Sequence, residues 1–185
     1  MLMLRIVLIG IVLTISLVQA YSRTHHAQPP SPKALVTAVP TAPELATAQC
    51  QAHGALPDPV CTPGAINPAV TQENISETIC KSGYTKSIRP TVSYTGRLKA
   101  DQMNQYGFTD GTRSHEEDHL ISLELGGAPS DPSNLWPEPG ASPNAKDKIE
   151  DFLRTAVCAG QISLAEAQHR IATDWTTADA GLRSR

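Results

Sequence analysis

The stretch from residue 116 to residue 148 gathers several side chains that could do chemistry; it reads EEDHLISLELGGAPSDPSNLWPEPGASPNAKDK. Asp118 and His119 stand together at the head of a short apolar segment, Asn134 follows His119 by 15 residues, and Asn144 follows Asn134 by 10. Histidine exchanges protons near neutral pH, and carboxylate and amide oxygens bind hard cations. Side chains of these types could hydrolyse a phosphodiester, which requires an activated water and neutralised charge on the phosphate.

The order of these features resembles the ββα-metal finger of the HNH (His-Me finger) endonucleases. An acidic-histidine pair heads a strand, a Gly126-Gly127 turn follows, and Asn134-Leu135-Trp136 then leads to an amphipathic helix. The resemblance in this motif covers residues 116–148, and the flanking segments resemble those of small exported bacterial proteins with an HNH-like core. It implies an α+β fold: a small domain with a ββα-metal core plus flanking helices.

By this resemblance His119 is the general base and Asp118 is a metal ligand. Asn134 would hold the loop and the His119 ring. Asn144 stands where many members of the family have a further histidine, and it would be the second metal ligand. Oxygen donors from Asp and Asn suit Mg²⁺ better than Zn²⁺, so the resemblance implies a divalent metal, with Mg²⁺ preferred and Mn²⁺, Zn²⁺ or Ni²⁺ as alternatives.

Two lysines, Lys146 and Lys148, lie just inside the start of the expected helix. They could contact the phosphate of a substrate, or they could belong to a solvated helix face, and charge arguments favour neither. A structural alternative also exists for Asp118 and His119, because paired charged groups are often structural. Trp136 is expected in the core rather than as a platform for a base.

The first 20 residues are typical of a secretory signal peptide. Arg5 is their only charge, residues 6–18 form an apolar run, and residues 18–20 read VQA, with small residues placed for cleavage. The alternative is an uncleaved anchor, but the run is shorter than the roughly 20 apolar residues that a bilayer span needs. We therefore expect a secreted or periplasmic protein that is not inserted in the membrane after cleavage.

The chain has four cysteines: Cys50, Cys61, Cys80 and Cys158. An even number in an exported chain indicates disulfides, and the spacings contain no C-x-x-C pair of the zinc type. Four cysteines allow three pairings. We predict a bridge between Cys80 and Cys158, each at the end of an expected helix, with Cys50 bound to Cys61 or peripheral. A bridge between Cys61 and Cys80 makes equal chemical sense.

The remaining sequence divides into a linker, one domain and a tail. Residues 21–55 are rich in Pro, Ala and Thr and are expected to form an extended linker. The HNH-like nuclease domain is expected over residues 56–178, followed by a tail over 179–185. Within the domain we expect helices over 70–80, 97–106 and 143–158 and after residue 163, with short strands over 84–89 and 118–125.

The motif and the net charge of the chain favour different functions. The formal net charge is −3, and it becomes −4 without residues 1–20, because only Arg5 is lost. The chain therefore lacks the broad basic surface of many nucleic-acid-binding proteins. The motif favours an exported metal-dependent endonuclease that acts on nucleic acid, DNA more than RNA. The acidic balance favours a non-catalytic exported module that binds a metal or an envelope partner on the same scaffold. The sequence does not specify an oligomeric state.

Overall fold

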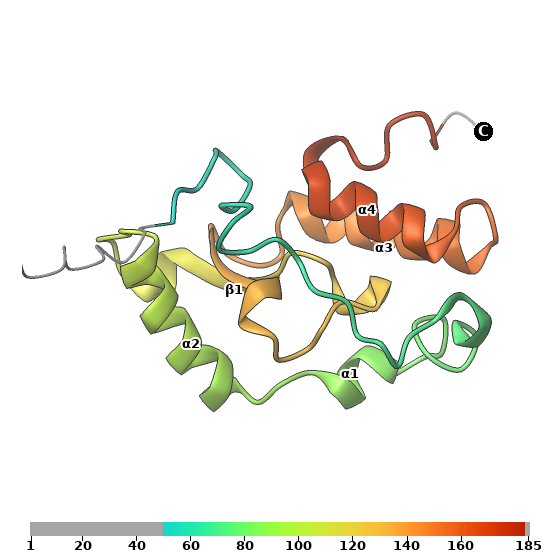
Figure 1. Cartoon of the computed structure of the whole chain (residues 1–185), viewed down its shortest axis with the longest axis horizontal. Helices are drawn as coiled ribbons and strands as arrows, with labels where there is room; N and C mark the ends of the chain where they lie inside the picture. The colour runs from blue at the N-terminus through green and yellow to red at the C-terminus, as the bar shows by residue number, and fades with distance from the viewer. Residues whose placement is uncertain (1–49, 184–185) are drawn as a thin grey trace, which may run out of the picture. The chain divides into compact units, whose positions relative to one another are not determined.

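The computed structural model describes residues 50–183, which contain both helices and strands (Figure 1). The expected α+β class is confirmed for this part of the chain. The expected signal peptide and the linker up to residue 49 lie outside the described residues. The elements are α1 (Tyr84–Ile88), α2 (Val92–Gln105), β1 (His115–His119), β2 (Leu135–Pro139), α3 (Ala145–Cys158) and α4 (Leu164–Asp174), with short 3-10 helices between them.

The two strands form an antiparallel sheet in which His119 lies opposite Leu135 and Glu116 lies opposite Glu138. β1 ends at His119, earlier than the expected strand over 118–125. One more bond of the antiparallel pairing follows, from the Leu120 N–H to the Asn134 carbonyl at 2.9 Å, and the chain then enters a loop. In the view of Figure 1, β1 lies between α2 and the pair formed by α3 and α4.

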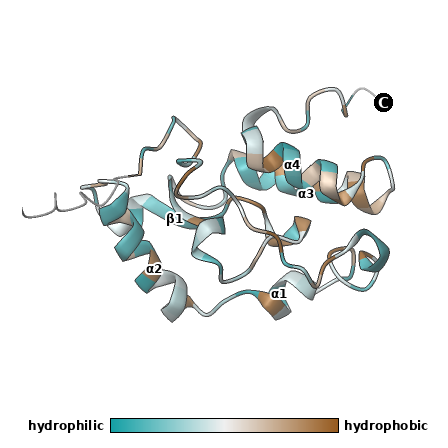
Figure 2. Ribbon diagram, viewed as in Figure 1, coloured by the Kyte–Doolittle hydropathy of each residue, from teal (hydrophilic) through white to brown (hydrophobic). Residues whose placement is uncertain are grey.

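The main apolar core is built from α3, α4 and the loops that cover them. The expected apolar stripe of the long helix is confirmed, since Leu153, Ala156 and Val157 are buried while Ile149 and Phe152 pack at the margin. α3 and α4 pack against each other and carry hydrophobic stretches, whereas α2 is mostly hydrophilic (Figure 2). A smaller cluster joins Trp136 to Tyr106 and Cys50, so the expectation that Trp136 belongs to the core is confirmed.

Two expected elements differ in the structure. Residues 84–89 were expected as a strand, but residues 84–88 form helix α1. Within residues 50–183 no third strand pairs with the sheet, and a helical turn satisfies its own backbone, as in the 3.1 Å bond from the Arg89 N–H to the Thr85 carbonyl. Residues 70–80 form turns and a short 3-10 helix, Gln72–Asn74, instead of an α-helix.

The folded part extends beyond the expected boundaries of 56 and 178. Cys50 is buried, and its N–H donates to the Gln105 carbonyl at 2.9 Å. At the other end, the Arg183 guanidinium lies 4.5 Å from the centre of the Phe152 ring. Across residues 50–183, no helix combines the length and apolar character needed to cross a membrane.

Two disulfides are present, Cys50–Cys61 and Cys80–Cys158. The predicted Cys80–Cys158 bridge is confirmed, and the alternative Cys61–Cys80 bridge is not formed. The longer bridge fastens the end of α3 to the segment that precedes α1. Two disulfides fit a protein that folds in an oxidising compartment.

Replacing Cys80 and Cys158 together by serine is expected to lower the free energy of unfolding by about 4 kcal/mol. The bridge spans 78 residues, and closing so long a loop restricts the unfolded chain strongly. The matched control replaces Cys50 and Cys61, which are separated by only 11 residues and should cost roughly 3 kcal/mol. Denaturant unfolding of the three proteins measures both values. A greater loss from the Cys50–Cys61 pair would contradict the expectation.

Candidate active site

His119 ends β1 and is only 6% exposed. Its Nε2 lies 2.9 Å from the Pro129 carbonyl oxygen. A carbonyl can only accept, so Nε2 carries the ring proton and Nδ1 is left unprotonated in the neutral ring. Burial lowers the pKa of His119, although the Pro129 carbonyl and Asp118 oppose this shift. His119 is therefore a neutral imidazole near pH 7, which is the form that a general base requires.

Asn134 holds together the loop between the two strands. Its side chain is fully buried; Nδ2 donates to the carbonyls of Ile121 at 3.0 Å and Ala128 at 3.1 Å. Its Oδ1 accepts from the Ile121 N–H at 2.9 Å and from the Ala65 N–H at 3.3 Å. The sequence-based role of holding the loop agrees with these contacts. The His119 ring, however, bonds to Pro129, so Asn134 acts on the ring only through the loop.

The Gly126-Gly127 turn has a steric reason. A Cβ atom at Gly127 would collide with the Ile121 carbonyl and would lie 2.8 Å from Nδ2 of Asn134. Gly126 has a φ of +72°, a region that side chains other than glycine rarely adopt. The loop backbone can therefore close around the Asn134 side chain only with these two glycines.

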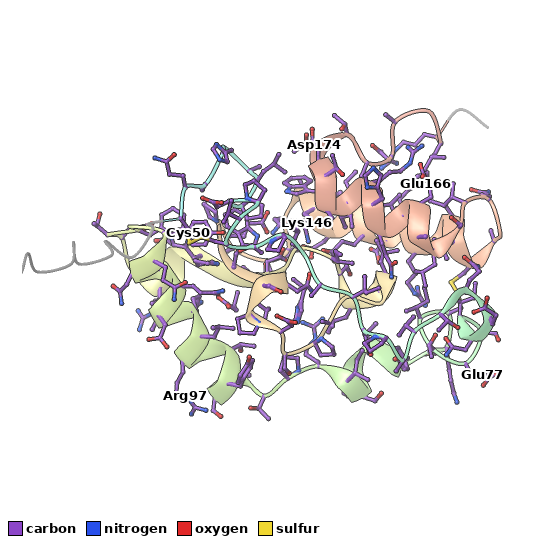
Figure 3. All side chains as sticks on the ribbon, viewed as in Figure 1. Cys50, Glu77, Arg97, Lys146, Glu166 and Asp174 are labelled. Atoms are coloured by element: carbon purple, nitrogen blue, oxygen red, sulfur yellow. A yellow bond between two sulfur atoms is a disulfide. The ribbon has the colours of Figure 1, made fainter. Side chains whose placement is uncertain are left out.

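Lys146 is the most unusual residue of the site, because its long charged side chain is only 1% exposed (Figure 3). Its Nζ lies 2.9 Å from Oδ2 of Asp118, 2.5 Å from Oε1 of Glu150 and 2.8 Å from the His119 carbonyl oxygen. Burial alone would lower the pKa of Lys146, but the two carboxylates raise it above its ordinary value, so the ammonium is charged.

This enclosure changes what the two lysines can do. The Lys146 ammonium already has three oxygen partners within 2.9 Å and almost no free surface, so its arrangement here does not support the expected contact with phosphate. It is not part of a solvated helix face either. Lys148 is exposed, and its contact with phosphate stays a prediction.

Asn144 is the N-cap of α3. Its Oδ1 accepts from the Lys146 N–H at 2.7 Å, and its backbone N–H donates to Oδ2 of Asp147 at 2.6 Å. The remaining donor, Nδ2, lies 3.1 Å from Oε2 of Glu138 and 3.5 Å from Oε2 of Glu116. In this arrangement Asn144 caps the helix and bridges two carboxylates.

Glu116 and Glu138 form a cross-strand pair of like charge. Glu138 is 4% exposed, and burial together with the Asp118 charge raises its pKa to about 8. Burial and Asp118 also raise the pKa of Glu116. Glu138 therefore retains its proton near neutral pH, which limits the repulsion between the two adjacent carboxyl groups.

Replacing Glu138 by glutamine is expected to stabilise the protein at alkaline pH and to change little at pH 5. The folded pKa of Glu138 is about 8 against an ordinary 4.5, so folding favours the protonated form. The contribution of Glu138 to the free energy of unfolding is then most favourable below pH 4.5, and it is lost as the pH rises through 8. The gain above pH 8 should be on the order of 3 kcal/mol, less than the full shift because neighbouring carboxyls share the effect.

Thermal unfolding across this pH range measures the effect of Glu138→Gln. The control is Glu77→Gln, at an exposed glutamate. Parallel pH profiles for the Glu138 variant and the unmodified protein would contradict the expected role of Glu138.

A small depression with a volume of about 40 Å³ lies beside His119. One guanidinium, from Arg89, lines it together with five carboxyl groups. Burial raises the pKa of Glu117 to about 8, against the influence of Lys99, and raises the pKa of Glu150 to about 7, against the influence of Lys146. The five carboxyl groups belong to Glu116, Glu117, Asp118, Asp147 and Glu150.

The two metal ligands implied by the resemblance are engaged elsewhere. Oδ2 of Asp118 is paired with Lys146, and Oδ1 of Asn144 accepts the Lys146 N–H. Among residues 50–183, no three His, Cys, Asp or Glu side chains are arranged to hold a metal ion. The residues as they stand do not fit a divalent metal, and the metal stays a prediction from the resemblance alone.

Three contacts of the candidate site are not fixed by the sequence. The Pro129 carbonyl that orients His119 leaves no sequence signal, because it belongs to the backbone. Arg89 reaches the depression through the tertiary fold. The pair of Lys146 and Glu150 did have a signal, since residues four apart on a helix lie on one face. Their burial was not visible in the sequence.

Comparison with known proteins gave no relatives: no family model, no curated protein and no solved structure matches this chain.

Proposed function

We propose that the protein hydrolyses phosphodiester bonds of nucleic acid, with His119 as the general base. The observation that supports this most strongly is that His119 has one ring nitrogen fixed and the other without a partner among residues 50–183. His115, in the same strand, provides the contrast. Its Nδ1 lies 3.0 Å from the Pro137 carbonyl and its Nε2 lies 2.8 Å from Asp110, so a structural histidine here uses both nitrogens.

In the proposed reaction, water in the depression transfers a proton to Nδ1 of His119 while its oxygen attacks phosphorus. A new P–O bond forms, the bond to the leaving oxygen breaks, and that oxygen takes a proton from solvent. The ring becomes an imidazolium, which the Pro129 carbonyl at Nε2 and the nearby Asp118 charge stabilise. The base thus stays fixed while its charge changes.

Arg89 is the residue best placed to receive the phosphate. It lines the depression with His119, is exposed, and forms no ion pair within the described residues. A guanidinium can donate two hydrogen bonds to the non-bridging oxygens of a phosphate. The surrounding carboxyl groups repel a phosphate less than their number implies, because Asp118 and Glu150 are paired with Lys146 and burial favours protonation of Glu117.

A second function has one observation in its favour. Five carboxyl groups surround the depression, and a phosphate must approach them past a single guanidinium. This arrangement suits a non-catalytic exported module that binds a cation or an envelope partner. The free nitrogen of His119 favours catalysis over that alternative.

Incubation of the oxidised protein with plasmid DNA tests the proposed function. Parallel samples contain Mg²⁺, Mn²⁺ or EDTA, and an RNA of similar length replaces the DNA in a second series. We expect nicked and linear plasmid, with less cleavage of RNA. Intact DNA and RNA in every sample would contradict the function and favour the non-catalytic module.

A further inference from the structure

We propose that Lys146 is a built-in cation, whose ammonium permanently occupies the place beside Asp118 and His119 that a divalent metal would take. The inference deepens the proposed function and rests on it for its catalytic meaning. The cation of this site is then covalently part of the chain, and cleavage does not require an added metal.

Lys146 has three oxygen atoms close to its ammonium. Nζ donates hydrogen bonds to the His119 carbonyl at 2.8 Å and to Oε1 of Glu150 at 2.5 Å, and its charge is paired with Oδ2 of Asp118 at 2.9 Å, an oxygen without a hydrogen-bond partner within the described residues. The side chain is enclosed, so no solvent competes for these donors. Moving the ammonium out would leave Asp118 and Glu150, both at least four-fifths buried, without their counter-charge, which is strongly unfavourable.

The secondary structure delivers the ammonium to this place. Lys146 is the second residue of α3, and its N–H is fixed by the Asn144 cap at 2.7 Å. Glu150 stands one turn further along the same helix, and Asp118 and His119 come from the end of β1. One side chain therefore joins the beginning of α3 to the end of the strand that carries the base.

A metal at this place would have to displace two sets of contacts. It would need Oδ2 of Asp118, now paired with Lys146, and Oδ1 of Asn144, now bound to the N–H that begins α3. Using both would break a buried ion pair and the helix cap together. The donors expected for a metal are thus already committed within the chain.

Lys146 is a positioning residue rather than a catalytic one. Its Nζ bonds to the carbonyl oxygen of His119 and not to the ring, so it holds the backbone that carries the base. Its charge also lies close to the His119 ring, where it opposes protonation.

Binding of Mn²⁺ to the oxidised protein tests the proposal directly. The electron paramagnetic resonance signal of free Mn²⁺ measures how much of the ion is bound. We expect no stoichiometric binding to the unmodified protein at submillimolar Mn²⁺. Lys146→Ala should bind one Mn²⁺ at least roughly tenfold more tightly, because a vacated space lined by two carboxylates and a carbonyl becomes available. The control Lys148→Ala changes an exposed lysine two residues away and should behave like the unmodified protein.

Stoichiometric binding of Mn²⁺ to the unmodified protein, lost in Asp118→Asn, would overturn the proposal. A folded Lys146→Ala that binds no Mn²⁺ would overturn it as well. If Lys146→Ala does not fold, the NMR signal of the Lys146 ammonium in the unmodified protein tests the proposal instead. It should persist unchanged in millimolar Mg²⁺, and its loss or displacement would refute the proposal. These outcomes do not depend on cleavage, so they separate this inference from the proposed function.

Discussion

Replacing His119 by alanine is expected to slow phosphodiester cleavage by about 10²–10⁴-fold, the usual contribution of a positioned general base. The loss should lie mainly in the catalytic rate constant, because His119 accepts a proton in the transition state and Arg89 is left to hold the phosphate. The alanine keeps the backbone bond from the His119 carbonyl to Lys146, so the fold should persist. Steady-state cleavage of a labelled DNA duplex measures the effect.

The matched control is His169→Ala, which removes an exposed histidine of α4. Its cleavage rate should equal that of the unmodified protein. Thermal unfolding of both variants verifies that they are folded at the assay temperature. Undiminished cleavage by a folded His119→Ala protein would remove His119 from the mechanism.

Replacing Asn134 by alanine is expected to produce the largest loss of stability, roughly 3–6 kcal/mol. The change leaves the N–H and the carbonyl of Ile121, the Ala128 carbonyl and the Ala65 N–H without their side-chain partner. Each buried polar group left unsatisfied costs about 1–3 kcal/mol. Small domains have only about 5–15 kcal/mol in total, so the variant should be partly unfolded at physiological temperature.

Urea unfolding of the oxidised protein measures this loss. Asn104→Ala is the control, since Asn104 is exposed on α2 and donates only to the Ala100 carbonyl. It should cost about 1 kcal/mol or less. A similarly small loss for Asn134→Ala would show that the loop does not depend on the Asn134 side chain.

The parts of the structure that follow from local chemistry could be predicted from the sequence. The apolar stripe of α3 follows from the helical period, although the helix begins at Ala145 behind the Asn144 cap and not at the expected residue 143. The turn at Gly126-Gly127 depends on backbone freedom. The pairing of Cys80 with Cys158 was predicted from the expected ends of two helices, although residues 70–80 do not form an α-helix.

The parts that depend on tertiary contacts could not be predicted. Residues 84–88 have a strand-like composition, but no strand within the described residues is available to pair with them, and they form α1. The burial of Lys146 depends on β1 and α3 meeting, and the contact of His119 with Pro129 depends on the path of the loop. The sequence indicated which residues gather at the candidate site. It did not indicate which of their polar atoms are used in structural hydrogen bonds and ion pairs and which are left for catalysis.

Cleavage of a defined DNA oligonucleotide in water labelled with the heavy oxygen isotope tests the central claim most directly. Mass spectrometry of the products shows whether solvent oxygen enters the new phosphate end. Hydrolysis by a water that His119 activates predicts one labelled oxygen in that phosphate with the unmodified protein, and far less product with His119→Ala. Uncleaved oligonucleotide with the unmodified protein, or equal amounts of labelled product with both proteins, would contradict the account.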